Sequence, residues 1–256
     1  MDTHNLTTNF EPETLPLLNF KSIEFINDGI CDGFKNMERD GELLKEAAAG
    51  NSPEVFRLYA WQPWCVSLGA HQDPSDIDTE ECFKNGFDIV KRPTGGRAVL
   101  HADEITYSAV LKITPQRTIH DIYRIIHELL LKALNPLVNF ELDFKKAQAD
   151  FKSIYKDSDS SAICFTSSAR HEITFKNRKV VGSAQRVFGD VVLQHGSILL
   201  GAGHERLADV LKTTDEKRIV LKGNLLQKSA TLSDIAGRKI TYGECADAIE
   251  KVFKSF

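Results

Sequence analysis

The chain has 256 residues, of which 42% are hydrophobic and 27% charged, and these are ordinary values for a globular protein with a substantial core. Its formal net charge of -4 does not point to a nucleic-acid-binding protein. No apolar run approaches the roughly 18 residues that span a bilayer, and the N-terminus lacks the apolar segment of a signal peptide. We therefore expect a cytoplasmic protein without nucleic-acid or membrane partners.

The first half of the chain is predicted to mix helices with short strands. Residues 1–20 are polar with two prolines, which is typical of a flexible arm. Apolar residues from Ile26 to Met37 recur at helical spacing and predict a first helix. Aromatic and β-branched residues over 56–68 predict two short strands or one bent strand, and Asp78 or Thr79 begins a short helix that ends at Asn85-Gly86.

Strands at 87–92 and 97–101 are predicted to flank a turn formed by Pro93 to Gly96, and a half-buried strand follows over 105–113. Thr118 with Asp121 predicts a capping box for a helix that ends before Pro136.

The second half is predicted to be mainly β-structure. Residues 145–161 have the composition of a mobile loop. Four strands over 162–165, 172–175, 179–187 and 191–200 then form a β-meander with turns at Asn177 and Gly189-Asp190. Thr241 with Glu244 caps a last helix. The sum is an α+β fold with mainly antiparallel strands and segregated helices.

Three segments have residues that could carry chemistry. The glycines of Arg92-Pro93-Thr94-Gly95-Gly96-Arg97 allow close backbone approach, and the two arginines add fixed charge, although a solvated hairpin turn would look the same. Lys179 opens a strand that contains the small Gly182, and an ordinary edge lysine is the alternative. His195 on a later strand is more often a packed residue than a base.

One of the five cysteines stands apart from the others. No Cys-x-x-Cys pair occurs, so neither a disulfide framework nor a zinc site is expected. Cys31, Cys65, Cys82 and Cys245 fit the pattern of small buried side chains. Cys164 instead follows a polar loop, and Arg170, Arg178 and Lys179 are candidates for lowering its thiol pKa.

These segments together, in this order, resemble the biotin/lipoate protein ligase superfamily, and within it the cysteine-dependent octanoyltransferases. The resemblance is carried by RLYAWQPWCVSLGAHQ (57–72), KRPTGGRAVLH (91–101), TYS (106–108), CF (164–165), KVVGSAQ (179–185) and LQHGSILL (193–200). It implies a curved, mixed, mostly antiparallel sheet with packed helices, in one catalytic domain over 21–256 with no separate C-terminal accessory domain.

The resemblance also implies roles for individual residues. Cys164 would be the nucleophile, and the Lys179 ammonium would favour its thiolate and hold the thioester carbonyl as charge develops. The implied substrate-binding residues are Arg92, Thr94, Gly95, Gly96, Arg97, Ala98, His101, Gly182, Ser183, Ala184 and His195, with no metal site.

The implied reaction is an octanoyl transfer in two steps, without cofactor or ATP. Cys164 attacks the octanoyl thioester of an acyl carrier protein, and a lysine of an E2 lipoyl domain or of the glycine-cleavage H protein then attacks the acyl-cysteine. An excess of basic residues in the matched segments suits acidic carrier partners: Lys91, Arg92, Arg97, Arg170, Lys176, Arg178, Lys179 and Arg186.

Three alternatives stay open. An ATP-dependent lipoate–protein ligase would form lipoyl-adenylate with Mg²⁺, but such enzymes usually have a third glycine where Arg97 stands. An amidotransferase would move octanoyl between carrier domains, again through a cysteine, and a binding module would hold an acylated carrier without turnover. Departures at Ala102 to Glu104, at Arg170-His171 and in the first helix bear on the choice of acceptor.

Overall fold

The computed structural model describes residues 18–145 and 172–256. The strand expected over 162–165, Cys164 and nearly all of the loop expected over 145–161 lie outside these residues. At the other boundary, Leu18 and Phe20 are buried, so the packed part of the chain already includes the last residues of the predicted arm.

A mixed, five-stranded sheet forms the centre of the molecule, in the order β1-β2-β6-β11-β10. β1 and β2 are parallel and the remaining pairs are antiparallel. The strands are β1 (Ile23–Cys31), β2 (Glu54–Trp61), β6 (Glu104–Lys112), β10 (Val181–Phe188) and β11 (Val191–Leu199). The predicted α+β class is therefore confirmed.

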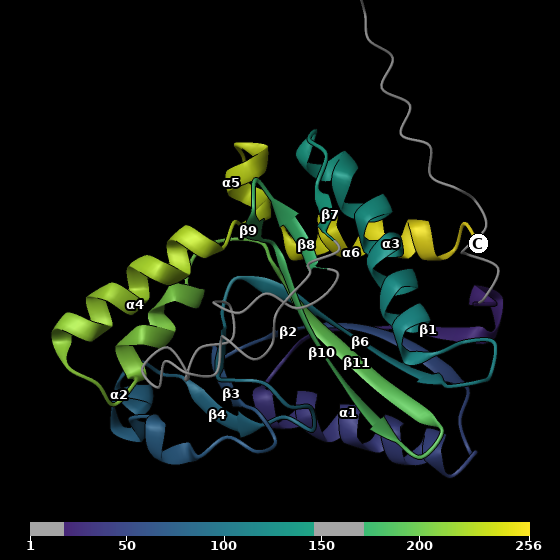
Figure 1. Cartoon of the computed structure of the whole chain (residues 1–256), viewed down its shortest axis with the longest axis horizontal. Helices are drawn as coiled ribbons and strands as arrows, with labels where there is room; N and C mark the ends of the chain where they lie inside the picture. The colour runs from purple at the N-terminus through teal and green to yellow at the C-terminus, as the bar shows by residue number, and fades with distance from the viewer. Residues whose placement is uncertain (1–17, 146–171) are drawn as a thin grey trace, which may run out of the picture.

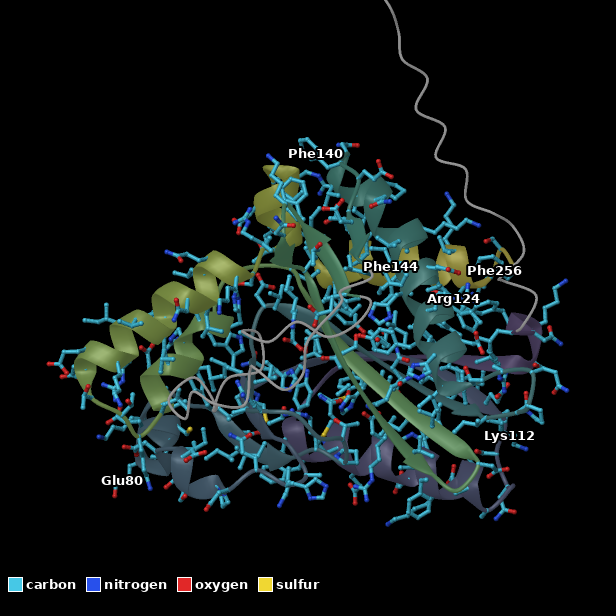
Figure 2. All side chains as sticks on the ribbon, viewed as in Figure 1. Glu80, Lys112, Arg124, Phe140, Phe144 and Phe256 are labelled. Carbon is cyan, nitrogen blue, oxygen red and sulfur yellow. The ribbon has the colours of Figure 1, made fainter. Side chains whose placement is uncertain are left out.

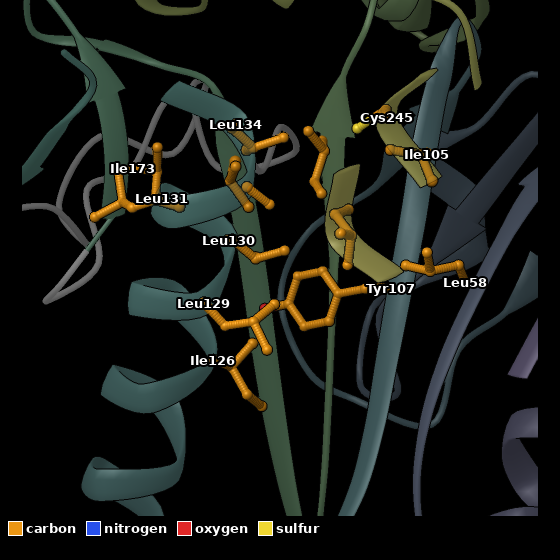
Figure 3. Packing of buried hydrophobic residues seen from close by; sticks show 14 of the residues in the cluster. Leu58, Ile105, Tyr107, Ile126, Leu129, Leu130, Leu131, Leu134, Ile173 and Cys245 are labelled. Carbon is orange, nitrogen blue, oxygen red and sulfur yellow. The ribbon is translucent and has the colours of Figure 1, made fainter. Parts of the chain in front are cut away.

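Helices cover both faces of this sheet. α3 (Ile119–Val138) and α6 (Tyr242–Phe253) lie on one face and α1 (Gly33–Ala48) lies on the other, with β10 and β11 running between them in Figure 1. Each predicted capping box is present, at Thr118 with Asp121 and at Thr241 with Glu244. Leucines of α3 point at Tyr107 of the sheet (Figure 3), which makes this the larger part of the hydrophobic core.

Two three-stranded sheets flank the central one. The first has the order β4 (Asp88–Lys91), β3 (Cys65–Leu68), β5 (Val99–His101), and the second the order β7 (Asp143–Lys145), β8 (Glu172–Phe175), β9 (Arg178–Lys179). A second hydrophobic cluster joins the first small sheet to α2 (Thr79–Lys84), α4 (Asp215–Lys228) and a 3-10 helix over His204–Val210. A short helix, α5 (Leu232–Ala236), packs against α3.

Several local predictions were wrong. The helix predicted from Ile26 begins only at Gly33, because Ile26 and Ile30 lie in β1. Pro136 lies inside α3, which ends at Asn139 with φ of 55°. β6 is buried along nearly its whole length rather than half-buried, because helices cover both sides of the central sheet. The strand predicted over 179–187 is divided between β9 and β10, which belong to different sheets.

Side chains at the edge of the molecule are more exposed than those that face the sheet. Phe140 comes just after α3 and lies at the edge of the molecule (Figure 2), where its side chain is 54% exposed, whereas the leucines one to three turns earlier face the sheet. Among the described helices, none is both long and apolar enough to cross a membrane.

We predict that Leu130→Ala destabilises the fold by about 2–5 kcal/mol, because Leu130 is fully buried between α3 and the sheet and its loss leaves a cavity. Chemical denaturation followed by circular dichroism measures this change. Leu226→Ala is the matched control, since Leu226 is 50% exposed on α4. Equal losses in the two variants would contradict the assigned packing.

Candidate active site

A pocket opens on the face of the central sheet that α1 covers, where this sheet meets β3 and β5. Its walls combine aromatic and aliphatic side chains with eight polar or charged residues. It is lined by Met37, Tyr59, Trp61, Ser67, Arg92, Val99, His101, Thr106, Lys179, Gly182, Ser183, Ala184, His195, Gly196 and Ser197. Segments that are far apart in the sequence therefore share one cavity.

The strand register explains why these residues meet. Arg57, Ser108, His195 and Ala184 form one row across β2, β6, β11 and β10, and residues paired in this way point to the same face. Tyr59, Thr106, Ser197 and Gly182 form a second row on that face. The row between them includes Tyr107, Gly196 and Ser183, and Tyr107 belongs to the core on the opposite face.

Gly196 is required where it stands. A Cβ at this position would come within 2.5 Å of Ser183 Oγ and within 2.8 Å of Tyr107 Cε1. Ser183 Oγ in turn hydrogen-bonds with the Tyr107 hydroxyl at 2.7 Å and with His127 Nε2 at 3.2 Å. Burial raises the pKa of Tyr107 to about 12, so this hydroxyl network is neutral and supports the β10 segment beside the pocket.

Asp40 connects α1 to the pocket row. It is fully buried, accepts hydrogen bonds from Arg57 Nη1 at 2.8 Å, Tyr59 Oη at 2.9 Å and Ser108 Oγ at 2.8 Å, and lies 3.5 Å from His195 Nδ1. Burial by itself opposes ionisation of Asp40, but the hydrogen bond from His195 and the charge of Arg57 outweigh it, so the pKa of Asp40 lies below its ordinary value.

His195 joins this network to the segment from Arg92 to Arg97, here called the glycine loop. Its Nε2 lies 2.6 Å from Thr94 Oγ1. Because Asp40 is ionised and accepts from Nδ1–H, the neutral ring accepts the Thr94 hydroxyl proton at Nε2. Burial lowers the pKa of His195 below its ordinary value, although the hydrogen bond with Asp40 opposes the shift.

Arg92 has an internal role that the sequence did not indicate. It is 5% exposed, and its guanidinium donates to the carbonyl oxygens of Ser67, Gly95 and Arg97 at 2.9, 3.0 and 2.7 Å. The glycine loop is therefore held by Arg92 from within. The hairpin prediction was wrong, because β4 and β5 do not pair with each other but lie on either side of β3.

His101 is held on three sides. Its Nδ1 lies 2.7 Å from Glu104 Oε1, its Nε2 lies 2.8 Å from Ser67 Oγ, and its ring stacks on Trp61 at 4.0 Å. Trp61 Nε1 donates to Thr106 Oγ1, which donates to Glu104 Oε1. Glu104 thus supplies the acidic partner of His101. It lies three residues after the histidine, although no acidic residue follows His101 immediately in the sequence.

Lys179 is buried rather than placed at a solvated edge. Its Nζ lies 2.7 Å from Glu172 Oε1, and both side chains are 8% exposed. β9 reaches this position because the Lys176-Asn177 turn has positive φ at both residues, and the backbone of Lys179 also accepts from Ala230. A buried ammonium group held by a carboxylate therefore lines the pocket together with apolar side chains.

The predicted site residues divide into four groups. One group lines the pocket: Arg92, His101, Lys179, Gly182, Ser183, Ala184 and His195. Thr94, Gly95, Gly96 and Arg97 form the adjoining loop, and Ala98 is fully buried in the second hydrophobic cluster. Cys164 lies outside the described residues. The individual roles of these residues stay predictions.

Several pocket residues were missed by the sequence analysis. Among them are Met37, Trp61 and Ser67 in the walls and Asp40, Glu104 and Glu172 as partners of pocket residues. One available signal was Arg57, a charged residue in the apolar run Val55 to Trp61, because a charge in a buried strand requires an opposite charge nearby.

The cysteines in the described residues are free thiols, and three of them are fully buried. Burial raises the pKa of Cys82 to about 11 and raises the pKa of Cys65 and Cys245 further. These three are therefore poor nucleophiles. Within residues 18–145 and 172–256, no three His, Cys, Asp or Glu side chains are grouped closely enough to share a metal ion.

Residues 32–254 match the lipoyl protein ligase A/B catalytic domain, and the chain belongs to this family. It is an enzyme of the acyltransferase class.

Named relatives agree with this assignment. The chain is 34% identical over 235 residues to the octanoyltransferase LipM of Staphylococcus epidermidis, an alignment that covers 90% of this chain and 85% of the relative. It is 36% identical over 229 residues to the octanoyltransferase LipM of Carboxydothermus hydrogenoformans, with 88% and 82% covered.

Solved structures share the fold. A bipartite lipoate protein ligase from Thermoplasma acidophilum, studied with its E2 lipoyl domain, aligns with a TM-score of 0.67 at 19% identity, covering 91% of this chain and 82% of that one. A lipoate-protein ligase A bound with ATP aligns with a TM-score of 0.65 at 18% identity, covering 91% and 83%.

We predict that Gly69→Ala weakens substrate binding and destabilises the fold by about 1–3 kcal/mol. A Cβ at Gly69 would overlap the carbonyl oxygen of Gly96 and displace the loop beside the pocket. Thermal unfolding and the KM for the acyl donor measure the two effects. Gly41→Ala is the control, because its Cβ meets nothing within 4 Å on α1. If Gly69→Ala kept both the thermal stability and the KM of the parent protein, the close approach of Gly69 to Gly96 would be refuted.

The lowered pKa of Asp40 predicts a pH-dependent contribution to stability. A depressed carboxyl pKa adds stability above the unfolded-state pKa of about 3.9, and this is lost as the pH falls through the lower folded-state pKa. Asp40→Asn should therefore cost about 3–5 kcal/mol near neutral pH and less below about pH 4. Denaturant titrations from pH 3 to 7 measure the difference, with the exposed Glu42→Gln on the same helix as control. A cost independent of pH would contradict the paired carboxylate.

Proposed function

We propose that the protein transfers an octanoyl group from an acyl carrier protein, through a thioester on Cys164, to a lysine of a lipoyl domain or of the glycine-cleavage H protein. The observation that carries this proposal is the similarity to octanoyltransferases LipM over 90% of the chain, joined to an apolar pocket that contains one buried ammonium group.

The pocket suits an unbranched acyl chain. Met37, Tyr59, Trp61 and Val99 offer apolar contacts that reward burial of methylene groups at about 0.8 kcal/mol each. The small residues Gly182 and Ala184 leave room for a chain to pass beside the backbone of β10. These features favour a fatty-acyl substrate over a polar one.

Lys179 supplies the charge that the chemistry needs. In the first step, the Cys164 thiolate attacks the thioester carbonyl, and the carrier's thiol leaves with a proton. A fixed ammonium group favours the thiolate and stabilises the oxyanion of the tetrahedral intermediate. Glu172 holds the ammonium in place, so the group is oriented before the substrate arrives.

The other cysteines argue for Cys164 by elimination. Cys65, Cys82 and Cys245 are buried with raised pKa values, and Cys31 is not among the residues that line the pocket. Covalent transfer through a cysteine needs no ATP, which separates this proposal from a ligase that forms lipoyl-adenylate.

The choice of carrier partners rests on the relatives and on surface charge. The lipoate protein ligase of Thermoplasma acidophilum was studied with an E2 lipoyl domain. Arg92 and Lys179 are buried here and do not present charge to a partner, whereas Lys91 and Arg186 are exposed near the loop. The basic surface proposed for carrier docking is therefore smaller than the sequence suggested.

We predict that the protein incubated with octanoyl-carrier protein and no ATP gains one octanoyl adduct of about 126 Da by intact mass spectrometry. Cys164→Ser should abolish the adduct, because the thiol is the attacking group, while Cys31→Ser should retain it. Lys179→Ala should slow adduct formation, because the thiolate and the oxyanion lose their cation.

An adduct that persists in Cys164→Ser would overturn the covalent route. Modification of the acceptor only with ATP and free lipoate would move the function to a ligase. Rapid hydrolysis of the octanoyl thioester without any acceptor modification would move it to a thioesterase.

A further inference from the structure

The network around Asp40 has one cation for two carboxylates. Arg57 is shared by both, with Nε 2.5 Å from Asp28 and Nη1 2.8 Å from Asp40. Asp40 is fully buried, so its charge partly offsets the desolvation that opposes a proton on a neighbouring group. His195, 3.5 Å from Asp40, is the titratable group placed to take it.

The surroundings of His195 satisfy both of its protonation states. In the neutral ring, Nδ1–H donates to Asp40 and Nε2 accepts from the Thr94 hydroxyl. When Nε2 gains a proton, the Thr94 oxygen accepts from it instead. Both ring nitrogens therefore keep a hydrogen-bond partner in either state, which limits the reorganisation that opposes proton uptake.

The second step of the proposed reaction requires a base. The acceptor lysine arrives as an ammonium ion, and its nitrogen attacks only after an N–H bond has broken and left the electron pair on nitrogen. As the new C–N bond forms, the C–S bond of the acyl-cysteine breaks. The sulfur leaves as thiolate or takes a second amine proton, and at least one proton must reach a base in each turnover.

We propose that His195 is the general base of this amine step and that Asp40 is the positioning residue that orients its ring. The proton of the acceptor lysine reaches Nε2 through the Thr94 hydroxyl, which gives its own proton to Nε2 as its oxygen takes one from the amine. The inference rests on the proposed acyl transfer and extends it to a residue that lines the pocket. His195 later returns the proton to solvent, which completes the cycle without any further reactant.

The other titratable groups of the pocket are less suited to this role. Lys179 is engaged as a cation with Glu172. His101 is stacked on Trp61 and held between Glu104 and Ser67, and Ser67 also accepts from Arg92. Burial keeps the pKa of His195 below its ordinary value, which favours the neutral form that a base needs at neutral pH.

The test separates the amine step by changing the nucleophile. Acyl-enzyme formed with octanoyl-carrier protein is mixed either with a lipoyl domain, whose lysine is protonated at pH 7, or with hydroxylamine, which is largely unprotonated. His195→Gln should slow transfer to the lysine about 100-fold and leave release by hydroxylamine near the parent rate. Loss of packing alone would slow both reactions together.

Asp40→Asn and Thr94→Val provide second variants, because His195→Gln may be less stable. Both should slow the lysine reaction selectively and less severely than His195→Gln. Glu42→Gln, exposed on the same helix as Asp40, should leave both rates unchanged. His101→Gln tests the other histidine of the pocket.

The pH profile of lysine transfer gives an independent readout. The inflection that reports the base should be present in the parent and absent in His195→Gln. The profile must be interpreted with the charged and titratable groups that face His195 from α1, β2, the glycine loop, β5 and β9: Asp40, Arg57, Tyr59, Arg92, His101 and Lys179.

Equal slowing of lysine and hydroxylamine in His195→Gln would assign a structural role and overturn the proposal. A selective loss in His101→Gln instead would identify the other histidine as the base. Absence of any acyl-enzyme in the parent would refute the proposed function itself, a result that the mass measurement reports before either nucleophile is added.

Discussion

The buried ion pair between Arg57 and Asp40 is the interaction on which the site depends most. It joins α1 to the middle of the central sheet, and Arg57 also contacts the backbone and side chain of Asn36. A buried charge that loses its partner costs several kcal/mol, so this pair fixes which face of α1 meets the sheet. Met37 on the same helix is thereby placed in the pocket wall, and Asp40 is placed against His195.

Close packing of two glycines joins the glycine loop to the first small sheet beside the pocket. Gly69 lies against the backbone of Gly96, and Ala70 donates to the carbonyl of Thr94, so the glycine loop is tied to the end of β3. Arg92 binds the same loop through three carbonyl oxygens. The Arg-Pro-Thr-Gly-Gly sequence therefore builds a rim of the pocket that its own arginine holds in place.

The sequence predicted what depends on neighbouring residues. Both capping boxes, the Asp78-capped helix and the β10–β11 hairpin are local features with specific residue signals. The prediction from sequence failed where one residue pattern fits both a helix and a strand. Ile26 and Ile30 are four residues apart, which suits a helix, but an even spacing also suits a strand, and the register shift between Asn27 and Gly29 hides the alternation. Asp40, Glu104 and Glu172 could not be assigned, because their partners lie on other elements.

The chemistry proposed for this pocket makes two opposite demands, and our proposal assigns them to different residues. Stabilising a thiolate and an oxyanion requires a group that stays cationic, whereas removing a proton from an amine requires one that stays neutral until it reacts. Lys179 is paired with the carboxylate of Glu172, which favours the charged form. His195 is buried, which favours the neutral form, yet it faces a carboxylate that can hold its proton for one step. A single residue could not be both cationic and neutral at one pH. A covalent route to an amide therefore benefits from two separate buried pairs, Lys179 with Glu172 and His195 with Asp40.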